Sequence, residues 1–115
     1  MTQLESLRVQ LREFAAARDW DEFHSPKNLA MALSVEAGEL LEIFQWLTEA
    51  QSRSLTPETQ AAASDEVADV LLYLIRLSDT LDIDPIAAAE RKLLANAERY
   101  PADKARGNSK KYTEL

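Results

Sequence analysis

Two pairs of acidic residues stand out because the members of each pair are three residues apart within an apolar stretch. Glu36 and Glu39 form the first pair, and Glu66 and Asp69 form the second. Residues at positions i and i+3 lie on the same face of a helix. A carboxylate buried without a partner costs several kcal/mol or takes up a proton. We therefore expect the two pairs to share a cation.

The kind of cation follows from the ligand atoms. Carboxylate oxygens are hard ligands and favour Mg²⁺ or Mn²⁺, and protein-bound Mg²⁺ is usually shared with the phosphates of a substrate. A di-iron carboxylate bundle is the rival interpretation, but it needs Glu-x-x-His motifs on two helices. The one histidine, His24, lies between predicted helices, and we interpret it as structural. The sequence thus predicts a magnesium site, with manganese as the alternative, at Glu36, Glu39, Glu66 and Asp69.

An acid pair at i, i+3 more commonly marks a solvated helix face, so the surroundings of both pairs matter. At 100° per residue, Glu36 falls in the middle of an apolar stripe that includes Leu33 and Leu40. The second pair lies at the start of a stretch in which nine of the eleven residues 67–77 are apolar and cover every side of a helix. A helix of that kind is expected to be buried. If the two helices pack antiparallel, all four carboxylates converge.

The helices themselves are predicted from apolar spacing and from three capping signals. Ser25-Pro26, Thr56-Pro57 and Asp84-Pro85 each place a capping side chain before a proline at the first helical position. The first helix carries leucines at i, i+3 and i+7 and ends near residue 18. The sequence predicts further helices at about 27–47, 56–81 and 85–99, a polar loop at 48–55 and an irregular tail from about 101.

Composition indicates an all-α protein. With two glycines and four prolines in 115 residues, little turn chemistry is available for a β-protein, and no strand pattern or repeat is present. The 46% hydrophobic content without a long apolar run excludes disorder and a membrane span. We expect one domain over residues 1–115, a four-helix bundle whose helices are assembled in an oligomer.

Charge and cysteine content limit the partners and the compartment. A formal net charge of −7 argues against nucleic-acid binding, which needs a basic face. The absence of cysteine excludes disulfides and thiolate metal sites and fits a reducing compartment. No basic segment followed by an apolar core is read at the N-terminus, so no signal peptide is expected. We expect a cytoplasmic protein that binds neither nucleic acid nor a membrane.

Several stretches around the acid pairs carry a family resemblance. Glu36-x-x-Glu39 followed by Glu66-x-x-Asp69 resembles the metal motif of the MazG-like all-α nucleoside triphosphate pyrophosphohydrolases. The resemblance extends over about residues 11–115 and is closest to the dCTP pyrophosphatase branch. It is carried by the runs FAAARDWDEFHSPKNLAMAL, EAGELLEIFQW, DEVADVLLYL, RYP and SKKYTEL.

This resemblance implies Mg²⁺-dependent cleavage between the α- and β-phosphates, which gives a nucleoside monophosphate and pyrophosphate. House-cleaning of the deoxynucleotide pool is the role that it implies. It also implies a homotetramer made of two dimers, with each site completed by a neighbouring chain, and a dimer is the simpler possibility. Leu11 stands where some members carry a histidine near the base pocket, which leaves the preferred base open.

Contacts with a nucleoside triphosphate substrate have candidates on three helices. There is no Gly-x-x-x-x-Gly-Lys pattern, so side chains and metal must meet the phosphate charge. The fourth helix offers a face with i, i+4, i+7 spacing, and the second helix offers its N-terminus, a natural anion site. These phosphate-binding candidates are Lys92, Asn96 and Arg99 on the former and Lys27 and Asn28 on the latter.

Three aromatic residues are candidates to stack a pyrimidine base. Trp46 follows Glu39 by seven residues, and Tyr73 follows Glu66 by seven residues, so each shares a helix side with an acid. Trp20 is the third candidate, although it fits ordinary core packing equally well.

Two other functions stay open. The first is a triphosphate pyrophosphatase of broad specificity. The second is a helical dimerisation module whose acidic side chains pair with lysines across an interface.

Overall fold

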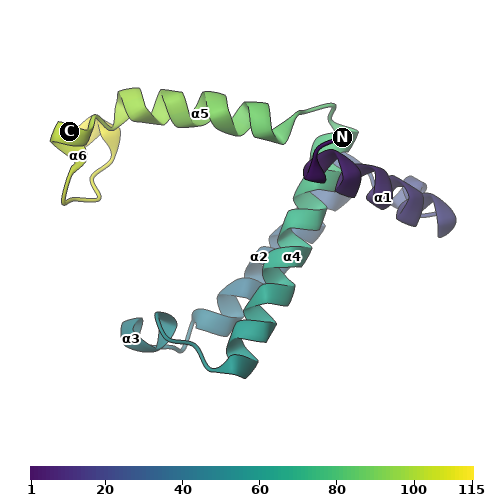
Figure 1. The fold of residues 1–115 in the computed structure, drawn as a ribbon, viewed down its shortest axis with the longest axis horizontal. Coiled ribbons are helices and arrows are strands. Elements are labelled where there is room, and N and C mark those ends of the chain that lie inside the picture. Colours follow the sequence, from purple (N-terminus) through teal and green to yellow (C-terminus); the bar gives the residue numbers. More distant parts are fainter. The chain divides into compact units, whose positions relative to one another are not determined.

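A computed structural model describes all 115 residues, and every element in it is a helix. The all-α prediction is therefore confirmed. The two short 3₁₀ helices are η1 (Asp21–Phe23) and η2 (Tyr112–Glu114). The α-helices, in chain order (Figure 1), are α1 (Gln3–Ala17), α2 (Pro26–Phe44), α3 (Glu49–Ser52), α4 (Pro57–Thr80), α5 (Pro85–Arg99) and α6 (Ala102–Ala105).

The three predicted cap-and-proline signals each begin a helix. Ser25 accepts a hydrogen bond from the Asn28 N–H at the start of α2. Thr56 does the same for α4, and Asp84 does so for α5. Each side-chain oxygen accepts a hydrogen bond from a backbone N–H that has no partner within its helix. Proline is tolerated at the first helical position because the N–H that it lacks would have no helical partner there. The predicted starts are therefore confirmed to within a residue.

Two segments expected to be irregular contain short helices. The predicted polar loop includes α3, because the Thr48 hydroxyl accepts from the Gln51 N–H and the Gln51 side chain accepts from the Thr48 N–H. This reciprocal arrangement is a capping box, and it stabilises the first turn of a helix. The predicted irregular tail likewise contains α6 and η2. Both segments correct the sequence-based interpretation.

The helices α2 and α4 pack along one another in opposite directions, and α1 contacts α4 (Figure 1). Leu29 of α2 and Ile75 of α4 are almost completely buried, and Ala15 of α1 is buried with them. These residues belong to a compact unit that extends from Met1 to Asp82. The antiparallel packing that the acid pairs require is thus present inside this unit.

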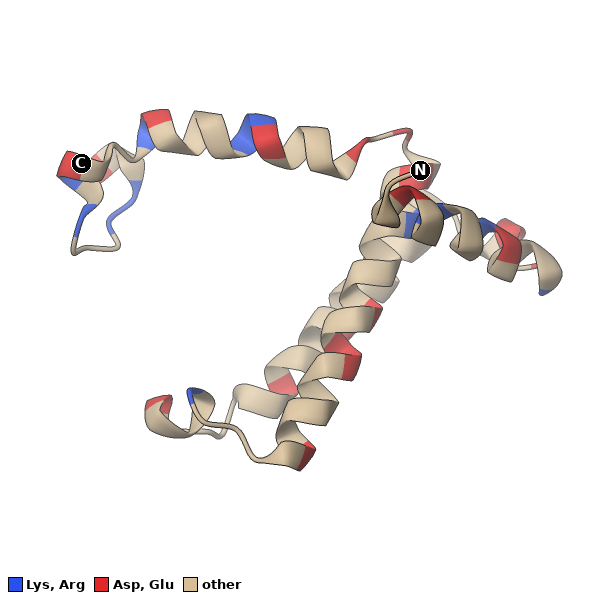
Figure 2. Cartoon of the chain, viewed as in Figure 1, with Lys and Arg blue, Asp and Glu red and all other residues tan.

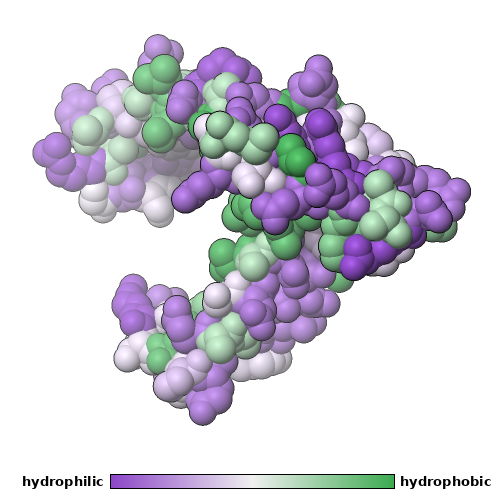
Figure 3. Space-filling model, turned by 45° about the vertical axis from the view of Figure 1, so that its right-hand side comes forward, coloured by the Kyte–Doolittle hydropathy of each residue, from purple (hydrophilic) through white to green (hydrophobic).

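Within the single chain, α4 is not buried on every side. Val67 is 54% exposed, and Leu71 and Leu74 are also exposed. Only α1 and α2 pack extensively against α4, so the remaining side of this apolar helix stays open to solvent. Figure 3 shows hydrophobic side chains, in green, at the molecular surface.

An ion-pair network ties α1 and the following segment to the end of α4. Arg12 donates two hydrogen bonds to the Asp79 carboxylate, at 2.6 and 2.5 Å. Arg76 donates from Nη2 to Asp21 at 2.8 Å, and its Nη1 lies 3.8 Å from Asp79. The hydrogen bond from Arg12 lowers the pKa of Asp79, and the positive charges nearby act in the same direction.

The second compact unit contains Ile83–Leu115. Within it, Tyr100 and Tyr112 meet edge to face with ring centroids 6.1 Å apart, and the Arg99 guanidinium lies 5.0 Å from the Tyr112 ring. These contacts fold η2 back onto the end of α5. No helix in the chain combines the length and the apolar character that crossing a bilayer would need.

Candidate functional site

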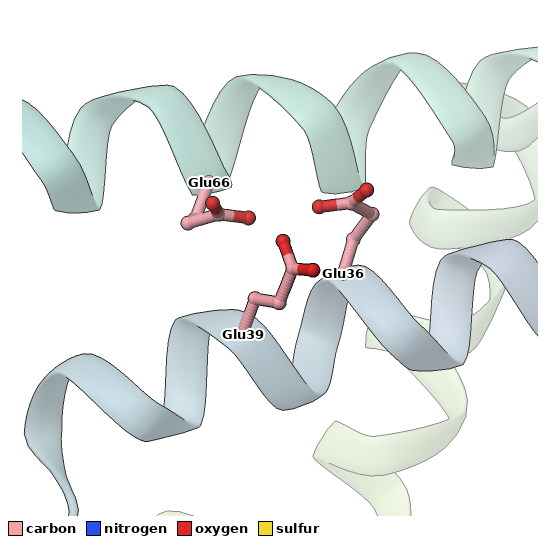
Figure 4. Close-up of side chains that lie close together, drawn as sticks. All are labelled: Glu36, Glu39 and Glu66. Atoms are coloured by element: carbon pink, nitrogen blue, oxygen red, sulfur yellow. The ribbon is translucent and has the colours of Figure 1, made fainter.

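Three of the four predicted acids meet between α2 and α4. Glu36 and Glu39 project from successive turns of α2, and Glu66 projects from α4 toward them (Figure 4). One carboxylate oxygen from each residue lies within 4.8 Å of the others. We refer to Glu36, Glu39 and Glu66 as the acid cluster.

No positive side chain is available along these helices to neutralise the acid cluster. Residues 28–44 of α2 and 57–75 of α4 contain neither lysine nor arginine, and Figure 2 shows only acidic residues along the middle of the pair. One oxygen of Glu36 and one of Glu66 are buried without a hydrogen-bond partner. A buried polar atom in this state costs free energy unless a ligand, an ion or a proton satisfies it.

The pKa values of Glu36 and Glu39 reflect the same unmet charge. The neighbouring Glu66 carboxyl raises the pKa of Glu36 most, followed by burial, and the negative charge of Asp69 acts in the same direction. The Glu36 carboxyl is the main cause that raises the pKa of Glu39. Carboxyls that raise one another's pKa favour the uptake of a proton or the binding of a cation.

The geometry fits a small, hard cation. Mg²⁺ binds oxygen at ~2.1 Å in octahedral geometry, so opposite ligand oxygens lie ~4.2 Å apart. The spread of 4.8 Å in the acid cluster is close enough for small side-chain rotations to close it. Three carboxylates leave several octahedral positions for water and phosphate oxygens, as is usual for Mg²⁺.

The fourth predicted ligand, Asp69, lies outside the acid cluster. Its charge still contributes to the raised pKa of Glu36, so it is within electrostatic range of the cluster. Asp69 lies about one turn beyond Glu66 on α4 and lines an adjacent cavity. It therefore connects the acid cluster to that cavity.

The cavity has a volume of about 210 Å³ and lies within the first compact unit. Drug-sized ligands occupy pockets of ~300–1,000 Å³, so this cavity suits one ring rather than a whole nucleotide. We refer to it as the ring cavity. It is mostly apolar, and it is lined by Leu11, Phe14, Trp20, His24, Asp69, Leu72, Tyr73 and Arg76.

The segment between α1 and α2 places two of the aromatic rings. Asp19 adopts a left-handed backbone conformation with φ of 54°, which ends α1 and turns the chain. The Trp20 N–H then donates to the Ala15 carbonyl at 2.9 Å, and the His24 N–H donates to the Trp20 carbonyl at 3.1 Å. The Trp20 ring lies edge-on to Phe14 at 5.7 Å. Trp20 thus lines the cavity instead of filling the core.

A wider groove lies on the other side of the acid cluster. It is about 450 Å³ in volume and is lined by Glu39, Glu42, Ile43, Ala62, Asp65 and Glu66. Four carboxylates in one groove repel a triphosphate in the absence of a cation. A phosphate chain would therefore enter it only together with metal.

The structure does not place Trp46 with the other aromatic candidates. Trp46 lies just beyond the end of α2, is 87% exposed and lines neither the ring cavity nor the groove. Its sequence spacing from Glu39 assumed that α2 continues to residue 47, whereas the helix ends at Phe44. A contact between Trp46 and a base would need a neighbouring chain.

The phosphate-binding candidates also lie outside the acid cluster. Asn28 is occupied, because its side chain donates to the Phe23 carbonyl and its backbone N–H donates to Ser25. Lys27 is exposed beside it. The other three, Lys92, Asn96 and Arg99, belong to α5 in the second compact unit. Their contact with phosphate stays a prediction.

Sequence analysis missed Arg76 and undervalued His24. The signal was present, since Asp69, Tyr73 and Arg76 are spaced i, i+4 and i+7 and share one face of α4. Arg76 was not among the predicted site residues, and the sequence interpretation gave His24 a structural role. Both residues line the ring cavity.

Comparisons with known proteins identify the family of this chain. Residues 31–115 match the model of the MazG-like family. Human dCTP pyrophosphatase 1 is 46% identical over 97% of this chain and 67% of its own length, and the bovine protein of the same name is 41% identical over 97% of this chain. A pyrophosphatase from Archaeoglobus fulgidus superposes with a TM-score of 0.82 at 41% identity, covering 88% of this chain and 94% of that one. This chain belongs to the MazG-like family.

Proposed function

We propose that this chain is a Mg²⁺-dependent pyrophosphohydrolase that converts dCTP, or a related pyrimidine deoxynucleoside triphosphate, to the monophosphate and pyrophosphate. The enzyme class rests on relatives called dCTP pyrophosphatase that are 41–46% identical over 97% of the chain. At that similarity the chain is a nucleoside triphosphate diphosphatase. The cation, the base and the site residues are the proposed parts.

The main support for the proposal is the position of the ring cavity beside the acid cluster. A cavity of single-ring size and an unneutralised acid cluster lie next to each other, and Asp69 connects the two. A pyrimidine in the ring cavity would direct its triphosphate toward the acid cluster. A pyrimidine ring fits a cavity of about 210 Å³, and the preference for a pyrimidine rests on the relatives called dCTP pyrophosphatase.

The reaction adds one water across the α–β phosphoanhydride. The water oxygen bonds to the α-phosphorus, the bond from that phosphorus to the bridging oxygen breaks, and pyrophosphate leaves. Mg²⁺, when bound, neutralises the phosphate charge that develops in this step. Glu36, Glu39 and Glu66 would hold the cation, and Asp69 would reach it directly or through water. Mn²⁺ satisfies the same ligands.

The water proton needs an acceptor, and the acid cluster supplies one. A carboxylate is an ordinary general base for a water proton, and Glu36 and Glu39 both lie beside the proposed cation site. Whichever of them is not turned toward the cation can orient the water and take its proton. Lys27, Lys92, Asn96 or Arg99 would meet the leaving pyrophosphate. Asn28 would do so only through the amide hydrogen that it does not donate to Phe23.

Base recognition would use the aromatic walls of the ring cavity. Trp20 and Tyr73 offer flat faces from opposite parts of the chain, and both line the ring cavity. Base–aromatic stacking contributes ~1–3 kcal/mol per base. Leu11 also lines this cavity and offers no hydrogen bond to a base edge. The absence of a hydrogen bond from Leu11 favours a second candidate function. This is a pyrophosphatase of broader specificity that selects a base by its size more than by hydrogen bonds to its edge.

The test is product analysis with a panel of triphosphates. Purified protein with Mg²⁺ should release pyrophosphate and the monophosphate from dCTP faster than from dATP or dGTP. Equal rates for dCTP, dUTP and dTTP, with slower purines, would favour the broader candidate. Release of inorganic phosphate instead of pyrophosphate, or no release from any triphosphate, would contradict the proposal and favour a non-catalytic helical module.

A further inference from the structure

Arg76 uses its guanidinium to hold groups on two sides of the ring cavity. Its Nε–H donates to Nδ1 of His24 at 3.2 Å, and its Nη2 donates to Asp21 at 2.8 Å. Asp79 lies 3.8 Å from Nη1. The Arg76 side chain is only 11% exposed. A planar guanidinium fixed by three partners has little freedom to turn, so its Nε–H direction is set.

This hydrogen bond determines which nitrogen of His24 carries a proton. The Nε of arginine always bears a hydrogen, so it can only donate. Nδ1 of His24 must therefore present its lone pair, and neutral His24 holds its hydrogen on Nε2. Burial lowers the pKa of His24, and the Arg76 charge lowers it further, against an opposing effect of Asp21. His24 is accordingly neutral at pH 7.

The Nε2–H of His24 is available to a ligand. No protein group accepts a hydrogen bond from it, and it is not among the side-chain polar atoms that are buried without a partner. His24 lines the ring cavity together with Trp20, whose ring centroid is 6.0 Å away. A ring stacked against Trp20 would thus meet a hydrogen-bond donor at its edge.

We propose that Arg76 is a positioning residue that locks His24 as the Nε2–H tautomer, so that His24 donates a hydrogen bond to an acceptor on the edge of the bound base. The inference rests on the proposed function for the identity of the ligand. Cytosine offers two adjacent acceptors, O2 and N3, whereas N3 of uracil and thymine carries a hydrogen. A fixed donor directed at N3 would therefore favour cytosine, whereas a donor directed at O2 would accept all three pyrimidines, because uracil and thymine carry the same O2 acceptor.

Because the chain contains a single histidine, its tautomer can be measured without assignment. Long-range ¹H–¹⁵N correlation spectra of the wild-type protein at about pH 8, above the ordinary histidine pKa, should show a protonated Nε2 and an unprotonated Nδ1. An Nδ1–H tautomer in the wild type would overturn the proposal, whatever the behaviour of any variant.

The variant Arg76→Met keeps much of the side-chain volume and removes the donor. It should give averaged tautomers and a KM for dCTP raised roughly tenfold, the ordinary effect of losing one well-aligned hydrogen bond. The kcat should stay within about twofold, because His24 is proposed to contact the base and not the phosphorus. A locked Nε2–H tautomer with an unchanged KM in Arg76→Met would contradict the proposal.

Arg12→Met is the matched control. Arg12 pairs with Asp79 on the other side of the same network and does not contact His24. Its loss should lower the melting temperature while the His24 tautomer and the KM stay as in the wild type. If Arg12→Met shifts the tautomer and the KM as Arg76→Met does, the cause is a general weakening of the ion-pair network. The proposal that Arg76 has a specific role is then wrong.

The spectra are recorded without nucleotide and so are independent of catalysis. A protein that shows the Nε2–H tautomer but hydrolyses no triphosphate would contradict the proposed function. A protein that hydrolyses dCTP but shows the Nδ1–H tautomer would contradict the role of Arg76 alone.

Discussion

The acid cluster combines three carboxylates, two buried oxygens without partners and no nearby lysine or arginine on its two helices. A folded protein tolerates this arrangement when a cation or a proton completes it. The sequence pattern at i, i+3 predicted which acids would meet, because helix geometry alone puts them on one face. The pattern also included Asp69, which lines the ring cavity and whose charge contributes to the raised pKa of Glu36; its role as a ligand stays a prediction.

Replacing one ligand charge tests the acid cluster at the residue scale. Glu39→Gln keeps the shape of the side chain but removes a charge from the proposed cation site. We expect kcat/KM for dCTP to fall by about 100-fold or more, since a bound metal supplies several kcal/mol and ~1.4 kcal/mol is tenfold. Steady-state pyrophosphate release measures it.

Glu42→Gln is the control for that experiment. Glu42 lies one turn further along α2, is exposed and borders the same groove, but it does not belong to the acid cluster. Its replacement should change kcat/KM by less than about threefold, since it removes only a screened surface charge. Equal losses in the two variants would mean that overall charge, and not ligation, governs activity.

The raised pKa values of Glu36 and Glu39 predict how metal-free protein responds to pH. Both groups bind protons more tightly when folded, so they add stability below their ordinary pKa of 4.5, and this contribution is lost as pH rises through the raised values. In a chelator, this contribution should therefore be lost between about pH 5 and pH 8, whereas the lowered pKa of His24 acts in the opposite direction in both proteins. The free energy of unfolding should accordingly fall more, or rise less, over this range in the wild type than in Glu36→Gln. Urea unfolding at both pH values measures it, and identical changes in the two proteins would contradict the shared charge.

At the scale of the elements, local sequence signals predicted where helices start, but they did not predict contacts between residues that are far apart in the sequence. A side-chain oxygen followed by proline fixes a helix start by satisfying a backbone donor, so Ser25, Thr56 and Asp84 could be recognised from the sequence. The end of α2 lacked such a signal, and the predicted helix was too long. Trp46 was consequently expected on the same side of the helix as Glu39, whereas it lies beyond the end of α2 and is exposed. The bond from Arg76 to His24 joins residues 52 positions apart and has no local signature.

Variants of the two tryptophans test which part of the base-binding site lies within one chain and which part a neighbouring chain contributes. Trp20→Ala removes a wall of the ring cavity, and we expect KM for dCTP to rise by about 5-fold to 150-fold, equivalent to ~1–3 kcal/mol for one stack. Titration of dCTP in pyrophosphate-release assays measures it. An unchanged KM in Trp20→Ala would remove the ring cavity from base recognition.

Trp46→Ala leaves the ring cavity intact, because Trp46 lies outside it. If each site is completed by a neighbouring chain, this variant should also weaken binding of dCTP, and only in the assembled form. An unchanged KM for every triphosphate would show that Trp46 does not contact the base.

At the scale of the whole molecule, the exposed side of α4 is the feature that one chain leaves unexplained. Val67, Leu71 and Leu74 are open to solvent on a helix that sequence analysis expected to be buried. A second copy of the same helix is the proposed cover, in a dimer or a tetramer formed by two dimers. Two-fold symmetry would then bring the same apolar patch of each chain together. In that assembly the four long helices of each chain are expected to act as one domain.

Assembly and activity should therefore be lost together. On dilution, the specific activity per chain is expected to fall at the concentration where light scattering shows dissociation, because oligomers of this kind often lack a stable folded monomer. Val67→Lys places a charge on the exposed apolar side and should move dissociation to higher concentration. A fully active monomer of either protein would contradict the need for a partner chain.

The most direct test of the account is a count of bound Mn²⁺ by electron paramagnetic resonance, which detects the free ion and needs no substrate. Wild-type protein and Glu42→Gln should bind Mn²⁺ with the same affinity. Glu66→Gln, which removes the one carboxylate that α4 contributes to the acid cluster, should bind it at least about tenfold more weakly. If Glu66→Gln binds Mn²⁺ as tightly as the wild type, the acid cluster is not the metal site.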